Sequence, residues 1–207
     1  MKQPIPIYLA VEDELSEWVV RRVLSSHGDR FAIGPVYGRA GFGYLKKQTL
    51  AFNNAAKGCP FLLLTDLDRY ACPPELLGDW LSVEKHKFFL LRVAVREVES
   101  WLLGDAPGLG RFLRLRTHPA VPDPEALQDP KHEVLARALR SPSRLLRESL
   151  VWRDEDSGRL CQGPDYNGTL SRFVNGFWDL DAAQQRCPSL AKLCAAVERL
   201  EAEYGKA

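Results

Sequence analysis

The chain has 207 residues, enough for one sizeable domain with an extension or for two small domains that share an interface. With 45% hydrophobic and 27% charged residues it has the composition of an ordinary globular protein. Its formal net charge of +1 excludes a general electrostatic attraction to nucleic acid or membranes, so any site for a polyanion must be local.

The first half alternates short apolar runs with helical patterns, which is typical of βαβ units around a parallel sheet. In chain order we expect a strand over 5–11, a helix over 15–27, a strand over 31–36, a helix over 42–57, a strand over 60–65, a helix over 74–82 and a strand over 87–95. The sequence therefore predicts a Rossmann-like, doubly wound α/β domain with a mostly parallel four-stranded sheet, over residues 1–105.

The second half has a different composition. No convincing strand follows residue 105, and prolines divide the chain into short helical pieces. The last segment, from Leu190 to Tyr204, keeps an apolar stripe at helical spacing and should form a closing helix. We therefore predict a C-terminal helical extension over residues 106–207, packed as a cap on the α/β domain.

Cysteine usage and apolar runs indicate the compartment. The five cysteines are odd in number and contain no C-x-x-C pair, so neither a disulfide framework nor a zinc site is indicated. The apolar run 5–11 is too short for a signal peptide, and no run approaches the roughly 20 apolar residues of a membrane span. The sequence thus predicts a cytoplasmic protein with no membrane partner.

Acidic residues follow three of the predicted strands. They are Glu12, Asp13, Glu14 and Glu17 after the first strand, Asp66 and Asp68 after the strand over 60–65, and Glu97 and Glu99 after the strand over 87–95. Because parallel strands carry their ligand sites at the carboxyl edge of the sheet, we expect all three clusters to converge there. Residues two apart in a strand face one way, which would aim each of the two later pairs into one volume.

Such an arrangement is typical of a metal site. Like charges so close are unfavourable unless a cation binds or one group takes up a proton. Mg²⁺ or Mn²⁺ suits an all-oxygen donor set, and two such ions can activate a water and stabilise the leaving oxygen of a phosphodiester. The alternative interpretation is that these acids are solvated or cap the next helices.

The order of these motifs resembles the Toprim fold of topoisomerases and primases. The matching segments are Val11-Glu12-Asp13-Glu14-Leu15-Ser16-Glu17, Leu64-Thr65-Asp66-Leu67-Asp68 and Arg96-Glu97-Val98-Glu99-Ser100-Trp101-Leu102-Leu103. The resemblance covers about residues 5–105 and is greatest to the overcoming-lysogenization-defect nucleases and to small Toprim-like proteins often encoded beside ATPases. It implies a metal-dependent nuclease that acts on DNA, in anti-phage or foreign-DNA defence, with an ATPase partner protein.

The resemblance also implies roles for individual residues. Glu12 would be a metal ligand or the general acid/base, Asp66 and Asp68 the metal-binding pair, and Glu97 and Glu99 further acidic ligands. Glu17 would match the second acid of the first motif. Two departures leave the choice between Glu14 and Glu17 open: the usual Glu-Gly turn is Glu12-Asp13 here, and the second acid falls one residue later than usual.

A lysine in the second half extends the resemblance. The segment Asp129-Pro130-Lys131 is similar to an Asp-Pro-Lys segment of the small Toprim-like proteins, which would place Lys131 beside the acids. A lysine there would stabilise developing negative charge on phosphate. The alternative is a solvated lysine in the first turn of a helix.

Two further features each allow two interpretations. The segment Gly38-Arg39-Ala40-Gly41-Phe42-Gly43 either contacts a phosphate with its backbone amides or is a plain turn. A run of arginines at helical spacing either contacts a nucleic-acid backbone or forms a solvated face; its members are Arg137, Arg140, Arg144 and Arg147.

Two functions of other classes compete with the nuclease. A receiver domain that accepts a phosphate on Asp66 would share the doubly wound fold, but the acids at Glu97 and Glu99 would repel an aspartyl phosphate. A catalytically silent, metal-binding subunit that docks on a partner protein is the other alternative.

Overall fold

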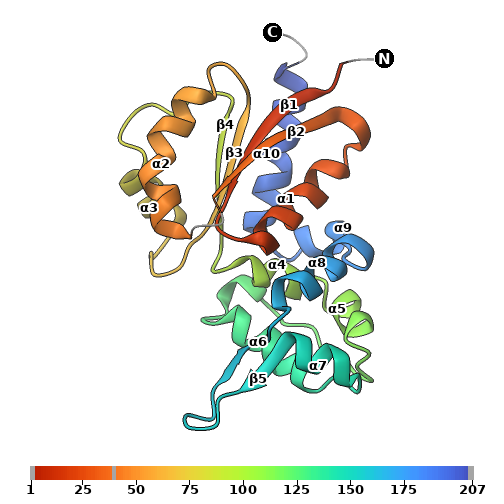
Figure 1. The fold of residues 1–207 in the computed structure, drawn as a ribbon. Helices are drawn as coiled ribbons and strands as arrows, with labels where there is room; N and C mark the ends of the chain where they lie inside the picture. The colour runs from red at the N-terminus through yellow and green to blue at the C-terminus, as the bar shows by residue number, and fades with distance from the viewer. Residues whose placement is uncertain (1–2, 39–40, 205–207) are drawn as a thin grey trace. The chain divides into compact units, whose positions relative to one another are not determined.

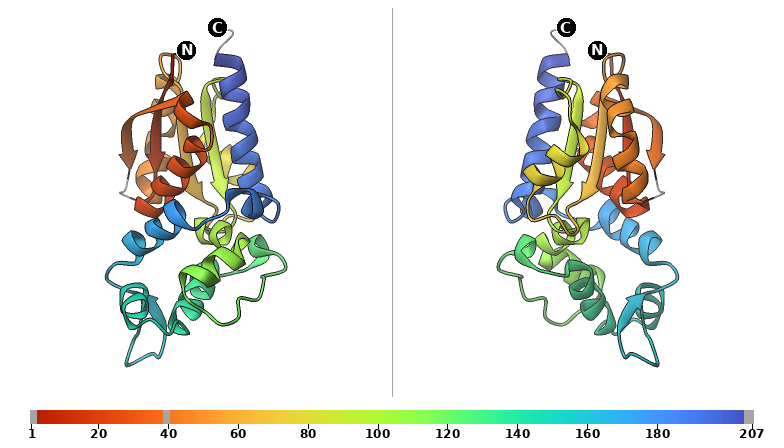
Figure 2. Two further views of the ribbon diagram at one scale, coloured as in Figure 1. Left: turned by 90° about the vertical axis from the view of Figure 1, so that its right-hand side faces the viewer. Right: turned by 90° about the vertical axis from the view of Figure 1, so that its left-hand side faces the viewer.

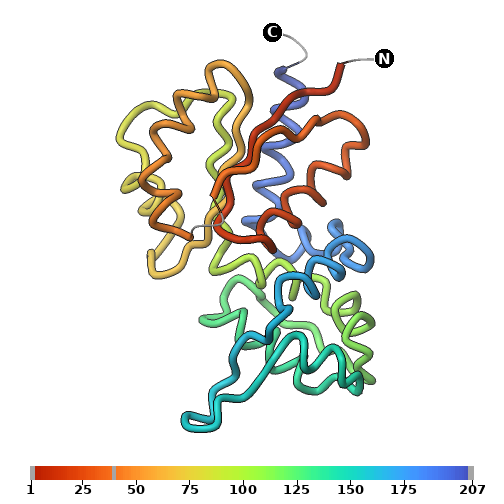
Figure 3. The backbone as a smooth tube through the Cα atoms, viewed as in Figure 1, coloured from red at the N-terminus to blue at the C-terminus, as the bar shows by residue number. Residues whose placement is uncertain are grey.

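The structure is a computed structural model that describes residues 3–38 and 41–204. The chain forms two compact units, whose paths can be followed in Figure 3. The first unit consists of Met1–Val95 and Ser189–Ala207, and the second of Arg96–Pro188.

The first unit is built on a four-stranded sheet with the order β2-β1-β3-β4, in which every neighbouring pair is parallel (Figure 1). Its strands are β1 (Ile5–Val11), β2 (Phe31–Gly38), β3 (Phe61–Asp66) and β4 (Phe89–Ala94). The two central strands are almost wholly apolar because helices cover both faces of the sheet. The architecture is the Rossmann-like, doubly wound α/β fold that the sequence predicts.

The helices of this unit lie on both faces of the sheet, as Figures 1 and 2 show. They are α1 (Glu14–Ser25), α2 (Phe42–Ala55), α3 (Pro73–Trp80) and α10 (Pro188–Tyr204), with a short 3-10 helix η1 (Gly28–Arg30). On one face, Phe52 of α2 and Trp80 of α3 pack in a core with Phe61 of β3. On that side Lys46 of α2 also reaches Asp79 of α3, with 2.6 Å between Nζ and Oδ2.

The last helix belongs to the sheet rather than to the helical half. The backbone N–H of Val95, just after β4, donates to Ser189 Oγ at 3.3 Å, and the rings of Phe88 and Tyr204 lie 5.5 Å apart. The helix α10 therefore runs along β4 from end to end. The two units thus differ from the predicted ranges 1–105 and 106–207: residues 96–105 group with the second unit and 189–207 with the first.

The second unit is mainly helical. Its elements are α4 (Val98–Gly104), α5 (Ala106–Phe112), η2 (Pro124–Ala126), α6 (Pro130–Leu139), α7 (Arg144–Leu150), β5 (Val151–Arg153), β6 (Leu160–Gln162), α8 (Tyr166–Gly176) and α9 (Leu180–Gln184). Trp101 is wholly buried, and its carbonyl accepts a hydrogen bond from Trp178 Nε1 at 3.2 Å. Prolines begin several of these short helices, as the sequence predicts.

The expectation that no strand follows residue 105 is wrong. The strands β5 and β6 form an antiparallel hairpin, with Trp152 opposite Cys161. Each strand has only three residues, too few to show an alternating pattern in the sequence.

Throughout the described residues, none of the helices combines the length and the apolar character needed to cross a membrane.

One position in the sheet, residue 38, requires glycine because of its backbone conformation. Gly38 pairs with Val11 at the end of β2, has φ of 105°, and would place an added Cβ against the carbonyl oxygen of Val11. We expect Gly38→Ala to reduce the free energy of unfolding by about 1–3 kcal/mol, measured by urea titration. Gly43→Ala in α2, where an added Cβ meets no atom within 4 Å, is the control and should not destabilise. Equal stability of the two variants would contradict this explanation.

Candidate functional site

The first part of the candidate site lies where β1 and β3 end. Because Val11 pairs with Leu64 in parallel register, the next residues, Glu12 and Thr65, come side by side. Glu12 Oε1 accepts a hydrogen bond from the backbone N–H of Asp66 at 2.9 Å and another from the Thr65 hydroxyl. The first and second acidic motifs are therefore joined directly, through the carboxylate of Glu12.

The surroundings of Glu12 disfavour the ionised form of its carboxyl group. Burial raises its pKa above the ordinary value, and the nearby charges of Asp68 and Asp13 raise it further, whereas the hydrogen bonds from Thr65 and Asp66 lower it. Asp13 and Asp68 are thus each close enough to Glu12 to repel its carboxylate. A cation or a shared proton would relieve this repulsion.

This pKa shift predicts a pH-dependent gain in stability on removing the charge. A carboxyl group whose folded-state pKa is raised costs stability when ionised, and the cost disappears once the pH falls below the unfolded-state pKa of about 4.3. Glu12→Gln keeps an oxygen that can accept both hydrogen bonds, so it should raise the Tm at pH 7–8, with the gain fading toward about pH 4. Thermal unfolding across this range, with the exposed Glu198→Gln as control, measures the effect. A gain that persists unchanged at pH 4 would contradict it.

The other acids of the first motif have structural partners. Asp13 caps α1 by accepting from Ser16 N at 2.8 Å, and Glu14 accepts from Trp18 Nε1 at 3.4 Å. Glu17 is buried on α1, with 2.8 Å between its Oε1 and Arg21 Nε. The capping alternative thus describes Asp13. The choice between Glu14 and Glu17 as a ligand stays open.

The second part of the candidate site lies in the second unit, around Lys131. Its backbone N–H donates to Glu97 Oε2 at 3.2 Å, and its Nζ lies 3.8 Å from Glu97 Oε1 and 3.5 Å from Glu99 Oε1. The first turn of α6 positions this lysine, because Asp129 caps the helix by accepting from His132 N at 2.7 Å and Pro130 follows the cap. The structure thus brings Lys131 to Glu97 and Glu99.

The acids of the second and third motifs are not arranged as the sequence predicts. Strand β3 ends at Asp66, and Asp68 has a left-handed φ of 49°, while Glu97 is the N-cap of α4 and Glu99 lies inside that helix. The two acids of each pair therefore do not share a strand face, and the strand-period argument for them is wrong. Glu97 and Glu99 instead both reach Lys131.

Sequence reasoning missed two residues here. Tyr166, at the start of α8, donates its hydroxyl to Glu99 Oε1 at 3.0 Å, and Thr65 donates to Glu12. The register of β1 and β3 could have indicated Thr65. No signal pointed to Tyr166, which is 67 residues from Glu99.

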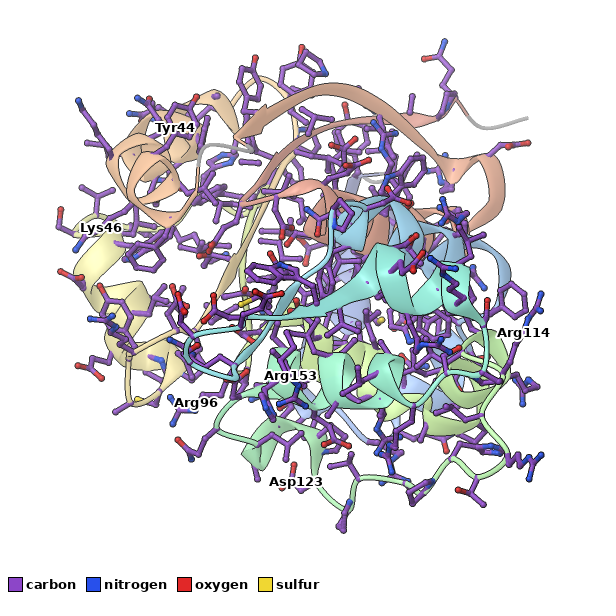
Figure 4. All side chains as sticks on the ribbon, turned by 60° about the horizontal axis from the view of Figure 1, so that its bottom comes forward. Tyr44, Lys46, Arg96, Arg114, Asp123 and Arg153 are labelled. Atoms are coloured by element: carbon purple, nitrogen blue, oxygen red, sulfur yellow. The ribbon has the colours of Figure 1, made fainter. Side chains whose placement is uncertain are left out.

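The tyrosine hydroxyl should matter for stability. Glu99 is only 3% exposed, so losing one of its donors leaves a buried carboxylate less well solvated. We expect Tyr166→Phe to reduce the free energy of unfolding by about 1.5–3 kcal/mol in denaturant titrations. The exposed Tyr44 of α2 (Figure 4) provides the matched control, Tyr44→Phe, which should have little effect. Equal losses would show that the hydroxyl of Tyr166 contributes nothing specific.

A continuous arginine stripe, one of the two interpretations of the arginine run, does not form. Helix α6 ends at Leu139 and α7 begins at Arg144, and most of the arginines serve local contacts. Arg137 is buried, and its Nε lies 2.7 Å from Glu133 Oε1. Arg144 Nε lies 2.6 Å from Glu148 Oε1, and Arg147 Nη1 donates to Ser141 O at 2.6 Å. In the glycine-rich segment 38–43, for which a phosphate contact and a plain turn are the two interpretations, Arg39 and Ala40 lie outside the described residues.

A divalent cation fits the chemistry of the acids. Within residues 3–38 and 41–204, no three His, Cys, Asp or Glu side chains are gathered as a preformed metal site. Mg²⁺, however, usually keeps several waters and takes one or two carboxylates, so a three-acid cluster is not required. The oxygen-only donors and the repulsion of Glu12 by Asp68 suit such an ion.

The fold defines the chain as a doubly wound α/β protein with a largely helical second unit. Neither a family model nor a curated protein matches it. Among solved structures, it is similar to the C-terminal region of the Burkholderia pseudomallei OLD protein, with a TM-score of 0.51 and 15% sequence identity over 94% of this chain and 98% of that chain. At this identity the similarity shows a shared fold.

Proposed function

We propose that this chain is a Toprim-like nuclease that cleaves phosphodiester bonds with the help of Mg²⁺ or Mn²⁺. The observation that carries the proposal is the carboxylate of Glu12, which joins the ends of β1 and β3 and has its pKa raised by burial and by Asp68. The similarity in fold to the C-terminal region of an OLD protein supports it. It agrees with the resemblance of the sequence motifs to the overcoming-lysogenization-defect nucleases.

The acids divide into expected ligands and groups that handle protons or charge. Asp66, Asp68 and Glu12 would be the principal metal ligands, with Glu97, Glu99 and Glu17 as further ones. When bound, the metal would supply Lewis-acid stabilisation and an activated water. A carboxyl group with a raised pKa, such as that of Glu12, holds its proton more readily than an ordinary carboxyl group, which suits a general acid/base.

The lysine would act on the substrate. In the second unit, Lys131 lies beside Glu97 and Glu99, and a primary ammonium group in such a site can stabilise negative charge that develops on phosphate. The proposed biological role is defence against foreign or phage DNA with an ATPase partner. That role is supported by the resemblance of the sequence motifs.

The test is a cleavage assay paired with metal binding. The full chain is incubated with supercoiled plasmid and with single-stranded circular DNA, with Mn²⁺, Mg²⁺ or EDTA, while calorimetry measures Mn²⁺ binding. We expect metal-dependent cleavage of at least one substrate and none in EDTA.

The other outcomes overturn the proposal in distinguishable ways. Mn²⁺ binding without cleavage of either substrate would favour the silent docking subunit. Transfer of phosphate from acetyl phosphate to Asp66 would favour the receiver. No binding and no cleavage would remove the metal site altogether.

A further inference from the structure

The second unit contains a basic groove that shares one residue, Lys131, with the candidate site. It has a volume of about 660 Å³ and lies between α6 and the β5–β6 hairpin. Lys131 and Arg140 line it from α6 and the residue that follows it, and Arg153 and Arg159 line it from the hairpin. Leu139, which is 39% exposed, adds apolar surface, whereas Leu135 is buried beneath the groove. We call this feature the hairpin groove.

Most of the positive charge of the hairpin groove is not neutralised by acidic side chains. Asp129 also lines it, but its carboxylate caps α6 by accepting from His132 N at 2.7 Å. Among the described residues, Arg140, Arg153 and Arg159 make no ion pair within 4.0 Å. A concave surface with several such cations attracts a polyanion even though the whole chain is nearly neutral.

The hairpin is held in place rather than loosely attached. Arg153 Nη1 donates to Gly158 O at 2.8 Å across the hairpin, and Figure 4 shows Arg153 on this element. At the turn, Asp154 accepts from Ser157 N at 2.8 Å and from Ser157 Oγ at 2.6 Å, so the acid near Arg159 is engaged locally. The arginines of the groove are therefore presented by an ordered scaffold, which lowers the entropic cost of binding.

The dimensions select among nucleic acids. A volume of about 660 Å³ lies in the range of small-molecule sites, which matches a nucleotide or two of one strand better than a stretch of duplex. Proteins that bind single strands combine a cationic groove along the backbone with aromatic side chains on which the bases stack. The hairpin groove supplies the cations, and in place of an aromatic ring it offers the apolar side chain of Leu139. One of its lining residues, Lys131, also contacts Glu97 and Glu99.

We propose that the hairpin groove binds the sugar-phosphate backbone of a single nucleic-acid strand and leads it to Lys131. Naming nucleic acid as the ligand rests on the proposed nuclease function. Arg140, Arg153 and Arg159 would each contact a phosphate, while Leu139 would lie under a sugar or base. The substrate would therefore be a single strand, or a duplex whose end has opened.

Binding measured without metal tests this inference apart from catalysis. Fluorescence anisotropy follows a labelled single-stranded oligonucleotide and its duplex form in EDTA, for the wild type and for the triple variant Arg140→Gln, Arg153→Gln, Arg159→Gln. The control triple variant, Arg22→Gln, Arg111→Gln, Arg199→Gln, removes the same charge elsewhere. We expect the groove variant to bind the single strand at least about tenfold more weakly and to lower the salt slope by about 2.

Three other outcomes would refute the proposed binding of a single strand in the groove and leave the nuclease function open. Equal weakening in both triple variants would reduce the effect to net charge, and tighter binding of the duplex than of the single strand would overturn the strand assignment. A wild type that does not bind the oligonucleotide in EDTA would remove the groove as a site. Conversely, groove-dependent binding without Mn²⁺-dependent cleavage would reject the nuclease and keep the groove.

Discussion

Asp66→Asn should reduce Mn²⁺-dependent cleavage by at least about a hundredfold while the chain stays folded. A metal ion contributes several kcal/mol of charge stabilisation, and each 1.36 kcal/mol is a factor of ten in rate. Asparagine keeps the size of the side chain and removes its charge. It also retains the backbone N–H that donates to Glu12 at 2.9 Å, so the junction of β1 and β3 should persist.

A matched variant controls for the loss of one negative charge. Asp29 is exposed in the first unit, and Asp29→Asn makes the same chemical change away from the acids. We expect this variant to cleave like the wild type, and both variants to show unchanged far-UV circular dichroism. Calorimetry should show weaker Mn²⁺ binding for Asp66→Asn alone. Undiminished cleavage by folded Asp66→Asn would remove Asp66 from the proposed ligands.

The first part of the site could be predicted because it follows from strand ends. Apolar runs gave the start of β1 at Ile5 and its end at Val11 correctly, and parallel pairing of Val11 with Leu64 then brings Glu12 to Thr65. Local hydrophobic pattern and sheet geometry were sufficient for this junction.

The second part depends on contacts that no local pattern encodes. Glu97 and Glu99 both reach Lys131 from the start of α4, and Tyr166 reaches Glu99 from the start of α8. A tertiary hydrogen bond between residues far apart in the chain leaves no periodic signal in one sequence. The same reason explains why the hairpin groove was missed, since α6 and a hairpin of three-residue strands form it together.

The boundary between the units shows the same limit. The apolar stripe from Leu190 to Tyr204 predicted a helix, and α10 confirms it. The stripe could not indicate which surface the helix would cover. Contacts of Ser189 with Val95 and of Tyr204 with Phe88 place the helix along β4.

Lys131→Met is expected to change metal binding and cleavage in opposite directions. The Nζ of Lys131 lies 3.8 Å from Glu97 Oε1 and 3.5 Å from Glu99 Oε1, where its positive charge competes with any cation that these carboxylates would bind. Removing it should tighten Mn²⁺ binding by about tenfold, because the ammonium charge would no longer compete with the ion for these carboxylates. Cleavage should nevertheless fall by about 10²–10³, because a donor to the phosphate is lost.

Calorimetry with Mn²⁺ and cleavage at saturating Mn²⁺ measure the two effects separately. Lys57→Met, which removes an exposed lysine in the first unit, is the control and should change neither. If Lys131→Met weakened both Mn²⁺ binding and cleavage, Lys131 would support the position of the carboxylates rather than compete for them. If it tightened Mn²⁺ binding and left cleavage intact, Lys131 would balance the charge of Glu97 and Glu99 without acting on the phosphate. The opposite signs of the two effects therefore separate a residue that acts on the substrate from one that only neutralises two buried or half-buried acids.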